Sequence, residues 1–485
     1  MVACRIAALA LCLLTGACSV GPRFSRPSVP QPADYVAPAE IENRAPEPGS
    51  PPVADRYVQA FVLGGDQPLE WWTEFHCPAL DALVSRAIAN NHTLAAAQDV
   101  VAQAREAVTS AYAAHYPQLT GTAGAGRQKL GAQFLGSFQI PPFSYVAFGA
   151  AASYSIDYLG VIGHQVGQRR ALAQYQRAQA SLVYLDLTGA VVTEVVTIAA
   201  TRAQIAALTE LLAEDRDNLN LVRKAFDNGS VSRLDVLTAQ SQLATDETLI
   251  APLRQQLSVA RHALAVLIGE APAGWSAPDM DLTALTLPRQ VPVSLPSQLV
   301  HRRPDILAAE AELRAATEAV GIATANLYPQ ITLTATGALE ATDPAQLFNA
   351  SSGAWSLISG LTAPIFDGGR LRAEQRGAVD ALHANAQRYQ QVVLESFGQV
   401  ADLLDALAHD SQLLAAQANA LATAQSSVDL ARESYAAGYS GVLQVIDAQR
   451  ARLEAQLGFV RAQAQQFLDT AQLSVALGGG PPSAP

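Results

Sequence analysis

The chain of 485 residues is poor in charge, and especially in positive charge. Charged residues make up 15% of it, whereas about 25% is usual in soluble proteins. Its 31 Lys and Arg residues against 43 Asp and Glu residues leave a net charge of −12. Proteins that bind nucleic acid present basic stripes or patches. We therefore expect no nucleic-acid partner.

The sequence also lacks a recognisable catalytic or metal-binding pattern. Its eight His residues are scattered, without the spacing that ligates a metal, and no Gly-rich phosphate loop follows a strand-like segment. Asp367, in the segment Asp-Gly-Gly-Arg, could be read as a catalytic aspartate. A helix cap is the favoured interpretation, because Gly368 and Gly369 allow the chain to turn into the helix that follows. We expect no enzyme activity, no metal and no cofactor.

Long apolar runs are missing too, apart from Ile6–Leu14, which follows Arg5. That run is too short to span a bilayer and is typical of an export signal. Thr15-Gly-Ala-Cys18 resembles a lipobox, so we expect a signal peptide at 1–17 and acylation of Cys18. The alternative is an ordinary signal peptide with an incidental cysteine. The Pro-rich stretch 18–65 is interpreted as an extended, lipidated tether.

Only two cysteines, Cys18 and Cys77, remain after such a cleavage. With Cys18 acylated, no intrachain disulfide is possible, although an exported protein would permit one. Stability must then come from packing.

What the chain does contain is a duplication of itself. Asn90–Thr120 aligns without a gap on Arg302–Thr332, with 12 of 31 positions identical, and both segments end in a Tyr-Pro-Gln motif. A period near 210 residues is too long for a solenoid repeat. The sequence therefore predicts two related halves, 66–290 and 291–477, followed by a disordered tail at 478–485.

Each half carries two segments in which apolar residues alternate with small or polar ones. The expected strands are about 118–130, 143–157, 330–341 and 354–366. Alternation over about 10 residues matches a transmembrane β-barrel, although an ordinary half-buried sheet has the same period. The export signal favours the barrel. Four strands cannot close one, and open edges are not viable in lipid, so we expect an oligomer.

Long helices follow the strand pairs. Segments 162–228 and 368–437 contain no Pro and predict helices about 90–100 Å long. Each ends at a glycine, and a shorter helix runs back. The remaining expected helices are 78–115, 231–268, 304–327 and 441–477. The fold class is therefore a mixed α and β membrane protein with an internal twofold repeat.

These motifs, in this order, resemble the TolC/OprM family of outer-membrane efflux channels, in its lipidated NodT-like branch. The motifs are Cys18–Pro22, Trp71–Phe75, both Tyr-Pro-Gln segments, Arg303–Ile306 and Pro364–Gly369. The resemblance implies a homotrimer with a 12-stranded barrel in outer-membrane lipid and a 12-helix α-barrel in the periplasm. It also implies a periplasmic adaptor and an inner-membrane RND-type pump as partners, and small toxic compounds or drugs as cargo. A duct for protein secretion and a periplasmic coiled-coil adaptor without a pore are the alternatives.

The resemblance further implies that the helical tips hold the gate. The tip glycines are Gly229 and Gly438, and Arg233 and Ser440 lie beside them in the adaptor-docking region. The residues carried over as a periplasmic constriction are Asp235, Gln444, Asp447 and Tyr435. Gln444 replaces an acidic residue of some relatives, and Ser440 replaces a basic one. Asp235 is equally a candidate helix cap, capping is favoured for Gln444, and Asp447 is the leading gate residue.

Overall fold

The structure is a computed structural model of the whole chain. It describes residues 20–30, 32, 34–35, 59–65, 67–129 and 141–479. The expected signal peptide, Cys18, most of the tether and the end of the tail lie outside these residues.

The chain forms two compact units. Unit 1 contains Val100–Gln176 and Ala308–Gln390 together with the N-terminal segment up to Pro27, and unit 2 contains the remaining stretches, Ser28–Asp99, Arg177–Leu307 and Gln391–Pro485. Each unit therefore takes segments from both halves of the sequence duplication. The division between units does not coincide with the division between repeats.

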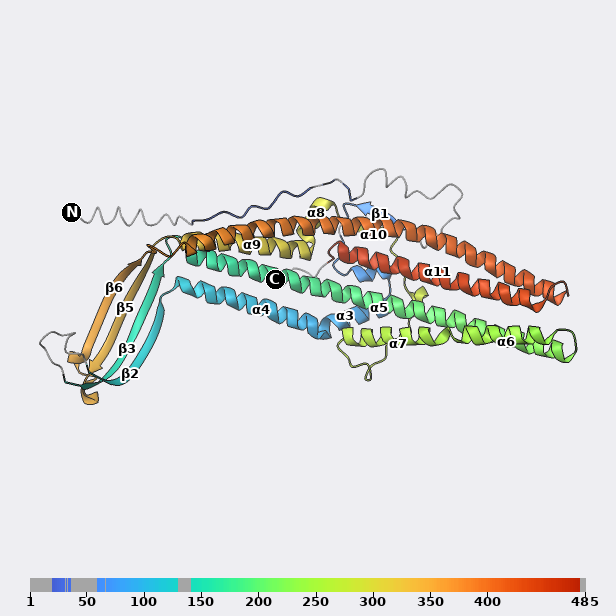
Figure 1. Cartoon of the computed structure of the whole chain (residues 1–485), viewed down its shortest axis with the longest axis horizontal. Coiled ribbons are helices and arrows are strands. Elements are labelled where there is room, and N and C mark those ends of the chain that lie inside the picture. The colour runs from blue at the N-terminus through green and yellow to red at the C-terminus, as the bar shows by residue number, and fades with distance from the viewer. Residues whose placement is uncertain are drawn as a thin grey trace. The chain divides into compact units, whose positions relative to one another are not determined.

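Unit 1 contains a four-stranded antiparallel sheet (Figure 1). Its strands, in spatial order, are β2 (Gln118–Gln128), β3 (Phe143–Ile156), β5 (Gln330–Ala341) and β6 (Gly353–Thr362). The central pair β3–β5 joins one half of the duplication to the other. The last strand ends at Thr362 rather than at the expected 366, because Pro364 cannot donate a ladder hydrogen bond.

The register of the sheet separates its two faces as the alternation predicts. Phe148 faces Leu339, and Ile156 aligns with Ile331, which in turn aligns with Leu361. The opposite face carries small and hydroxyl side chains, among them Thr336 and its partner Ser356, whose oxygens are 2.7 Å apart. One face is apolar and the other is small or polar. Among the described residues, the outer edges of β2 and β6 pair with no other strand.

Two helices of 67 residues dominate the chain: α5 (Val161–Asp227) and α10 (Arg370–Ala436). At 1.5 Å per residue each is about 100 Å long. The other α-helices among the described residues are α3 (Pro78–Asn90), α4 (His92–Tyr112), α6 (Arg233–Glu247), α7 (Ile250–Leu267), α8 (Pro296–Arg302), α9 (Pro304–Ala325) and α11 (Val442–Ala476).

Two of the expected helices are each divided in the structure. The segment expected as one helix over 78–115 is interrupted at Asn91, whose backbone is extended and whose Oδ1 accepts a hydrogen bond from Leu94 N at 3.0 Å. The expected helix 231–268 is interrupted at Thr248–Leu249. A short parallel pair, β1 (Ala60–Leu63) with β4 (Gln290–Val293), was not expected at all.

The largest apolar core lies in unit 2. Trp71, Trp72 and Phe75 are buried there, and the ring centroids of Phe75 and Phe467 are 5.9 Å apart. Cys77 belongs to the same core as a small buried thiol. Part of the expected tether also packs on unit 2, since Tyr35 donates a 2.8 Å hydrogen bond to the Ser294 carbonyl. Burial raises the pKa of Tyr35 to about 12.

Among the described helices, α5 is long and apolar enough, by length and composition, to cross a membrane. Half of its most apolar stretch is buried inside the protein. Packing within the chain therefore accounts for about half of that stretch.

Candidate functional site

Both helical hairpins of unit 2 turn at a glycine in the left-handed region. Gly229 has φ +73° and Gly438 has φ +77°, a conformation that L side chains rarely adopt. At the first tip Ser230 N donates to Ala225 O at 2.9 Å, and at the second Tyr439 N donates to Ser434 O at 2.9 Å. Each of these hydrogen bonds is the 6→1 bond of a Schellman motif, which commonly ends a helix. Sequence and structure agree on where the hairpins turn.

Asp235 caps the helix that returns from the first tip. Its Oδ2 accepts hydrogen bonds from Ser232 N at 2.8 Å and from Ser232 Oγ at 2.7 Å. Asp235 N in turn donates to Ser232 Oγ at 3.3 Å, which completes a capping box. The hydrogen bonds from Ser232 lower the pKa of Asp235, so its carboxylate stays charged over the physiological range.

The second tip is built differently. Its returning helix begins at Gly441, which offers no side-chain cap, and the structure shows no hydrogen bond from the Gln444 side chain among the described residues. The favoured interpretation of Gln444 as a cap was therefore wrong. Gln444 and Asp447 are both exposed, whereas Tyr435 packs against the apolar cluster beside the tip. Tip residues Arg233 and Tyr439 are exposed as well.

Asp367 lies at the start of α10. Its Oδ2 accepts from Leu371 N and its Oδ1 from Gly369 N, each at 2.9 Å. These backbone donors lower the pKa of the carboxyl. Gly368 and Gly369 have φ +65° and +86°. The geometry is that of a helix cap after a turn that needs glycine, with the carboxylate fully engaged by backbone.

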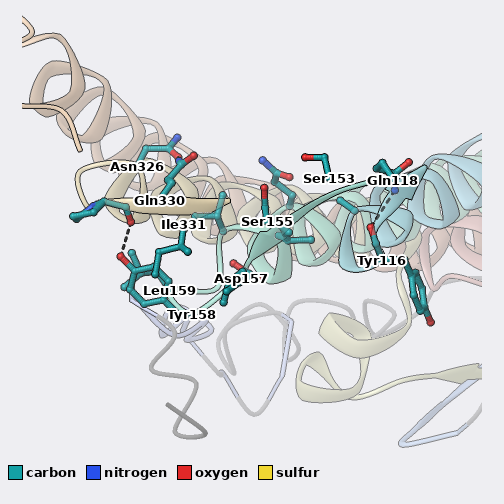
Figure 2. A pocket seen from close by; sticks show the side chains of 16 residues that line it. Tyr116, Gln118, Ser153, Ser155, Asp157, Tyr158, Leu159, Asn326, Gln330 and Ile331 are labelled. Carbon is teal, nitrogen blue, oxygen red and sulfur yellow. Dashed lines mark hydrogen bonds between the residues drawn. The ribbon is translucent and has the colours of Figure 1, made fainter. Parts of the chain in front are cut away.

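A cavity of about 360 Å³ lies in unit 1, where helices and strands meet. Figure 2 shows its hydroxyl and amide side chains, which come from both Tyr-Pro-Gln segments and from the end of β3. The hydroxyl of Tyr158 donates to Pro329 O at 2.5 Å. Asp157, its one carboxylate, accepts from Gly163 N at 2.9 Å. Both hydrogen bonds connect segments of unit 1 at the junction of strands and helices.

Sequence reasoning missed a buried polar layer in the middle of the hairpins. Asp215 and Asn218 are buried although they fall on the apolar stripe of α5 that contains Leu208, Leu212, Leu219 and Val222. Burial first, and the neighbouring Asp246 carboxyl second, raise the pKa of Asp215 to about 7. In a second buried pair, burial and the neighbouring Asp469 carboxyl raise the pKa of Asp410 to about 7. The signal in the sequence was Asp215 itself, a polar residue at a position where the helical spacing of the stripe predicts an apolar one.

Within the described residues, no cluster of three or more His, Cys, Asp or Glu side chains is placed to hold a metal ion. The site residues fall into three groups. Asp235 and Asp367 cap helices, Gln444 and Asp447 are exposed at the second tip, and Asp215 and Asn218 are buried between helices.

Comparisons with known proteins give a consistent result. A family model described as "Outer membrane efflux protein" matches residues 83–270 and 295–479, one stretch in each half of the duplication. The chain is 31% identical over 488 residues to the pyoverdine export outer membrane protein OpmQ of Pseudomonas aeruginosa, covering 98% of this chain and 97% of that protein. It is 28% identical to the cation efflux system protein CusC of Escherichia coli O6:H1, covering 98% and 99%.

Solved structures show the same fold. The outer-membrane channel OprN superimposes with a TM-score of 0.84 at 24% identity, covering 96% of this chain and 99% of that one. A crystal structure of CusC superimposes with a TM-score of 0.79 at 26% identity, covering 96% and 100%.

Proposed function

Because the chain belongs to the outer membrane efflux protein family, we propose that it is the exit duct through which small toxic compounds leave the cell. It is an outer-membrane efflux channel that extends into the periplasm. The observation that carries this function is the family match in both halves, together with near-complete coverage of relatives named as export and efflux proteins.

The sheet supports a trimeric barrel. Among the described residues, the outer edges of β2 and β6 have no partner strand, and lipid does not tolerate unpaired backbone groups. Pairing β6 of one copy with β2 of the next satisfies both edges, and three copies give 12 strands. The apolar face, which includes Phe148, Trp355 and Leu361, then faces lipid, and the hydroxyl-bearing face lines the lumen.

The long helices support a duct beyond the membrane. Each chain supplies α5, α10 and their returning helices, so three chains supply a 12-helix α-barrel. The tips at Gly229 and Gly438, with Arg233 and Ser440, would dock a periplasmic adaptor, which links the duct to an inner-membrane RND-type pump. Cys18, acylated by lipid, would anchor the chain to the outer membrane.

We place the periplasmic constriction at Asp447, with Asp235, Gln444 and Tyr435 around it. Trimer symmetry would bring three copies of the Asp447 and Asp235 carboxylates to one axis, where they favour cations and repel anions. Asp447 is favoured because no hydrogen bond engages its carboxylate among the described residues, whereas Ser232 holds that of Asp235.

The cargo is a small solute. The relatives are named for pyoverdine export, cation efflux, and solvent and toluene efflux, so the family accommodates different small molecules and the pump selects among them. None of these names describes protein export.

Purified protein inserted in planar bilayers tests the function. The expected result is ion conductance, and chemical cross-linking of the same protein should give a trimer. In a separate experiment, cells that lack the gene should be hypersensitive to drugs. A stable monomer without conductance would refute the duct.

A further inference from the structure

The sheet of unit 1 contains the same strand pair twice, once from each repeat. Gln118 of β2 pairs with Ser153 of β3, and Gln330 of β5 pairs with Thr362 of β6. Gln330 follows Gln118 by 212 residues, and Thr362 follows Ser153 by 209 residues. Helices α5 and α10, which come after β3 and β6, are both 67 residues long and also begin 209 residues apart. Strand pairing and helix starts therefore give the same residue-by-residue correspondence between the repeats.

The two repeats meet inside one chain where β3 pairs with β5, which we call the repeat interface. At its end nearest the helices, Ile156 of β3 lies opposite Ile331 of β5. Ile156 is 37% exposed and Ile331 is half-buried. Just beyond the strands, the Tyr158 hydroxyl donates to the Pro329 carbonyl oxygen (Figure 2). The helix end of the repeat interface is therefore closed by an apolar pair and a hydrogen bond.

The two outer edges of the sheet carry the counterparts of that apolar pair. The residue 209 positions after Ile156 is Ile365, which follows β6, and the residue 212 positions before Ile331 is Leu119 on β2. Ile365 is 99% exposed and Leu119 is 76% exposed, although their counterparts contact a neighbouring strand. Among the described residues, neither outer edge has a partner strand. The edges thus hold the two halves of an apolar contact that the chain completes only at the repeat interface.

The hydrogen bond of the repeat interface cannot form at the outer edges. The counterpart of Tyr158 is Asp367, whose carboxylate accepts hydrogen bonds from two backbone amides at the start of α10. An ionised carboxylate has no proton to donate to a carbonyl oxygen. The place of Asp157 is taken by Phe366, which is 92% exposed. A contact at the helix end of these edges is therefore apolar where the repeat interface is partly polar.

We propose that the edge of β6 docks onto β2 of a second copy of this chain in the register that the repeat interface has within one chain. This inference rests on the proposed function, because it specifies how copies of the duct join. The register places Leu361 opposite Ala123 of the partner subunit and Ile365 opposite Leu119 of the partner subunit. Ile365 and Phe366 then close the helix end of this subunit interface by apolar contact, without the hydrogen bond of the repeat interface.

The side chains on the two edges favour this register over its neighbours. A shift by one residue would place Leu361 opposite Thr122 or Gly124 and turn the apolar face of one strand to the polar face of the other. A shift by two residues keeps the faces. It would place Ile365 either opposite Gly121, which has no side chain, or beyond Gln118, where β2 begins. Only the proposed register brings Ile365 to an apolar side chain of β2.

Paired cysteines in the full-length protein test the register. In the double variant Leu361→Cys, Ala123→Cys, the thiols of neighbouring copies would be directly opposite, with Cα atoms about 4.5–5.5 Å apart. That distance permits a disulfide. Within one chain the same positions lie three strand spacings apart, about 14 Å, so the disulfide can form only between copies. After mild oxidation, denaturing gels without reductant should show linked dimers and trimers.

The double variant Leu361→Cys, Ala125→Cys is the matched control. Ala125 lies on the same face of β2 as Ala123 but two residues further along the strand, and such diagonal neighbours are about 7–8 Å apart. We expect about tenfold slower cross-linking in this displaced pair, because its separation exceeds the disulfide range. The single variants measure any background from Cys18 and from Cys77, which is buried. Equal or faster cross-linking of the displaced pair would overturn the register.

The apolar closure of the subunit interface is tested separately. Ile365→Ser and Phe366→Ser each remove an apolar side chain from the subunit interface and leave the repeat interface unchanged. We expect the trimer in detergent to dissociate about tenfold faster on heating, the effect of losing the burial of one large apolar side chain. Phe348→Ser is the control, since Phe348 is 80% exposed but precedes β6. Dissociation at the control rate in both variants would refute the apolar closure.

Conductance of the same samples separates this inference from the proposed function. A conducting trimer in which the proposed cysteine pair does not cross-link faster than the displaced pair refutes the register alone. A trimer that cross-links in the proposed register but does not conduct refutes the duct alone. A protein that stays monomeric refutes both.

Discussion

His164 Nδ1 lies 2.5 Å from Glu318 Oε2, and the ring's other nitrogen lies 3.0 Å from the carbonyl oxygen of Val20. The imidazole thus ties the backbone just after Cys18 to α9. Gly321 makes room for it, since a Cβ there would lie 2.6 Å from the His164 ring.

Replacing His164 with Ala should release this N-terminal segment. We expect trypsin to cleave after Arg23, which precedes Phe24, roughly five- to tenfold faster, because a charged hydrogen bond is lost and local opening becomes easier. Mass spectrometry of the released peptides measures the rate. His409→Ala is the control, since His409 is exposed and lies 3.6 Å from Asp405. Equal rates in both variants would contradict the tie.

Asp447→Ala should increase conductance and reduce the preference for cations, because it removes one carboxylate per chain from the proposed constriction. Single-channel recordings with a salt gradient measure both quantities. Exchange protection of α6 should stay at the wild-type level. Unchanged cation preference would place the constriction elsewhere.

Asp235→Ala should fray the start of α6. It removes the acceptor of two hydrogen bonds from Ser232, and we expect exchange at the first-turn amides to rise roughly fivefold. Gln444→Ala is the matched control at the second tip, where no such cap exists, and it should leave α11 exchange unchanged. Equal effects at the two tips would show that Asp235 is not a cap.

Arg452→Ala should destabilise the hairpins of unit 2. Its guanidinium bridges two glutamates of α5 with a side-chain exposure of 11%, and loss of such partly buried charged bonds costs roughly 1–3 kcal/mol. Thermal denaturation followed by circular dichroism measures the change. Arg450→Ala is the control, because its contact with Glu454 is 3.6 Å long and exposed.

Trp71→Ala should be the most damaging of these changes. Trp71 is 1% exposed at the centre of the main core, and removal of a buried Trp costs roughly 3–5 kcal/mol. Trp355→Ala is the comparison: Trp355 is 83% exposed on the apolar face of the sheet, so it should weaken membrane insertion more than core stability.

Local pattern was enough to predict several elements. Alternation over 330–341 gave β5 its bounds, and glycine after an uninterrupted helical stretch located both tips, because period and backbone conformation are local properties. The break at Thr248–Leu249 could not be predicted, because the sequence there contains no Pro or Gly. The parallel pair β1–β4 joins residues about 230 apart, a contact that no local period encodes.

The site was less predictable for the same reason. Asp235 and Gln444 occupy equal positions after their tips, yet only Asp235 has a hydroxyl residue three places before it to complete a capping box. The meeting of Asp215 with Asp246 depends on how α6 lies against α5. The spacing of apolar residues along α5 identifies Asp215 as a polar residue on a buried face, but it does not predict which residue lies next to it.

The central strand pair β3–β5 has a consequence for the origin of the chain. It joins the two repeats through 11 paired positions, and in a ring of copies the β6–β2 contact would recur between chains. In the trimeric barrel proposed above, a half-length ancestor would have needed six separate molecules and six intermolecular strand pairings to close the ring. Fusing two halves turns every second pairing into an intramolecular one, with a high effective concentration. In that barrel the duplication would replace half of the assembly steps with folding.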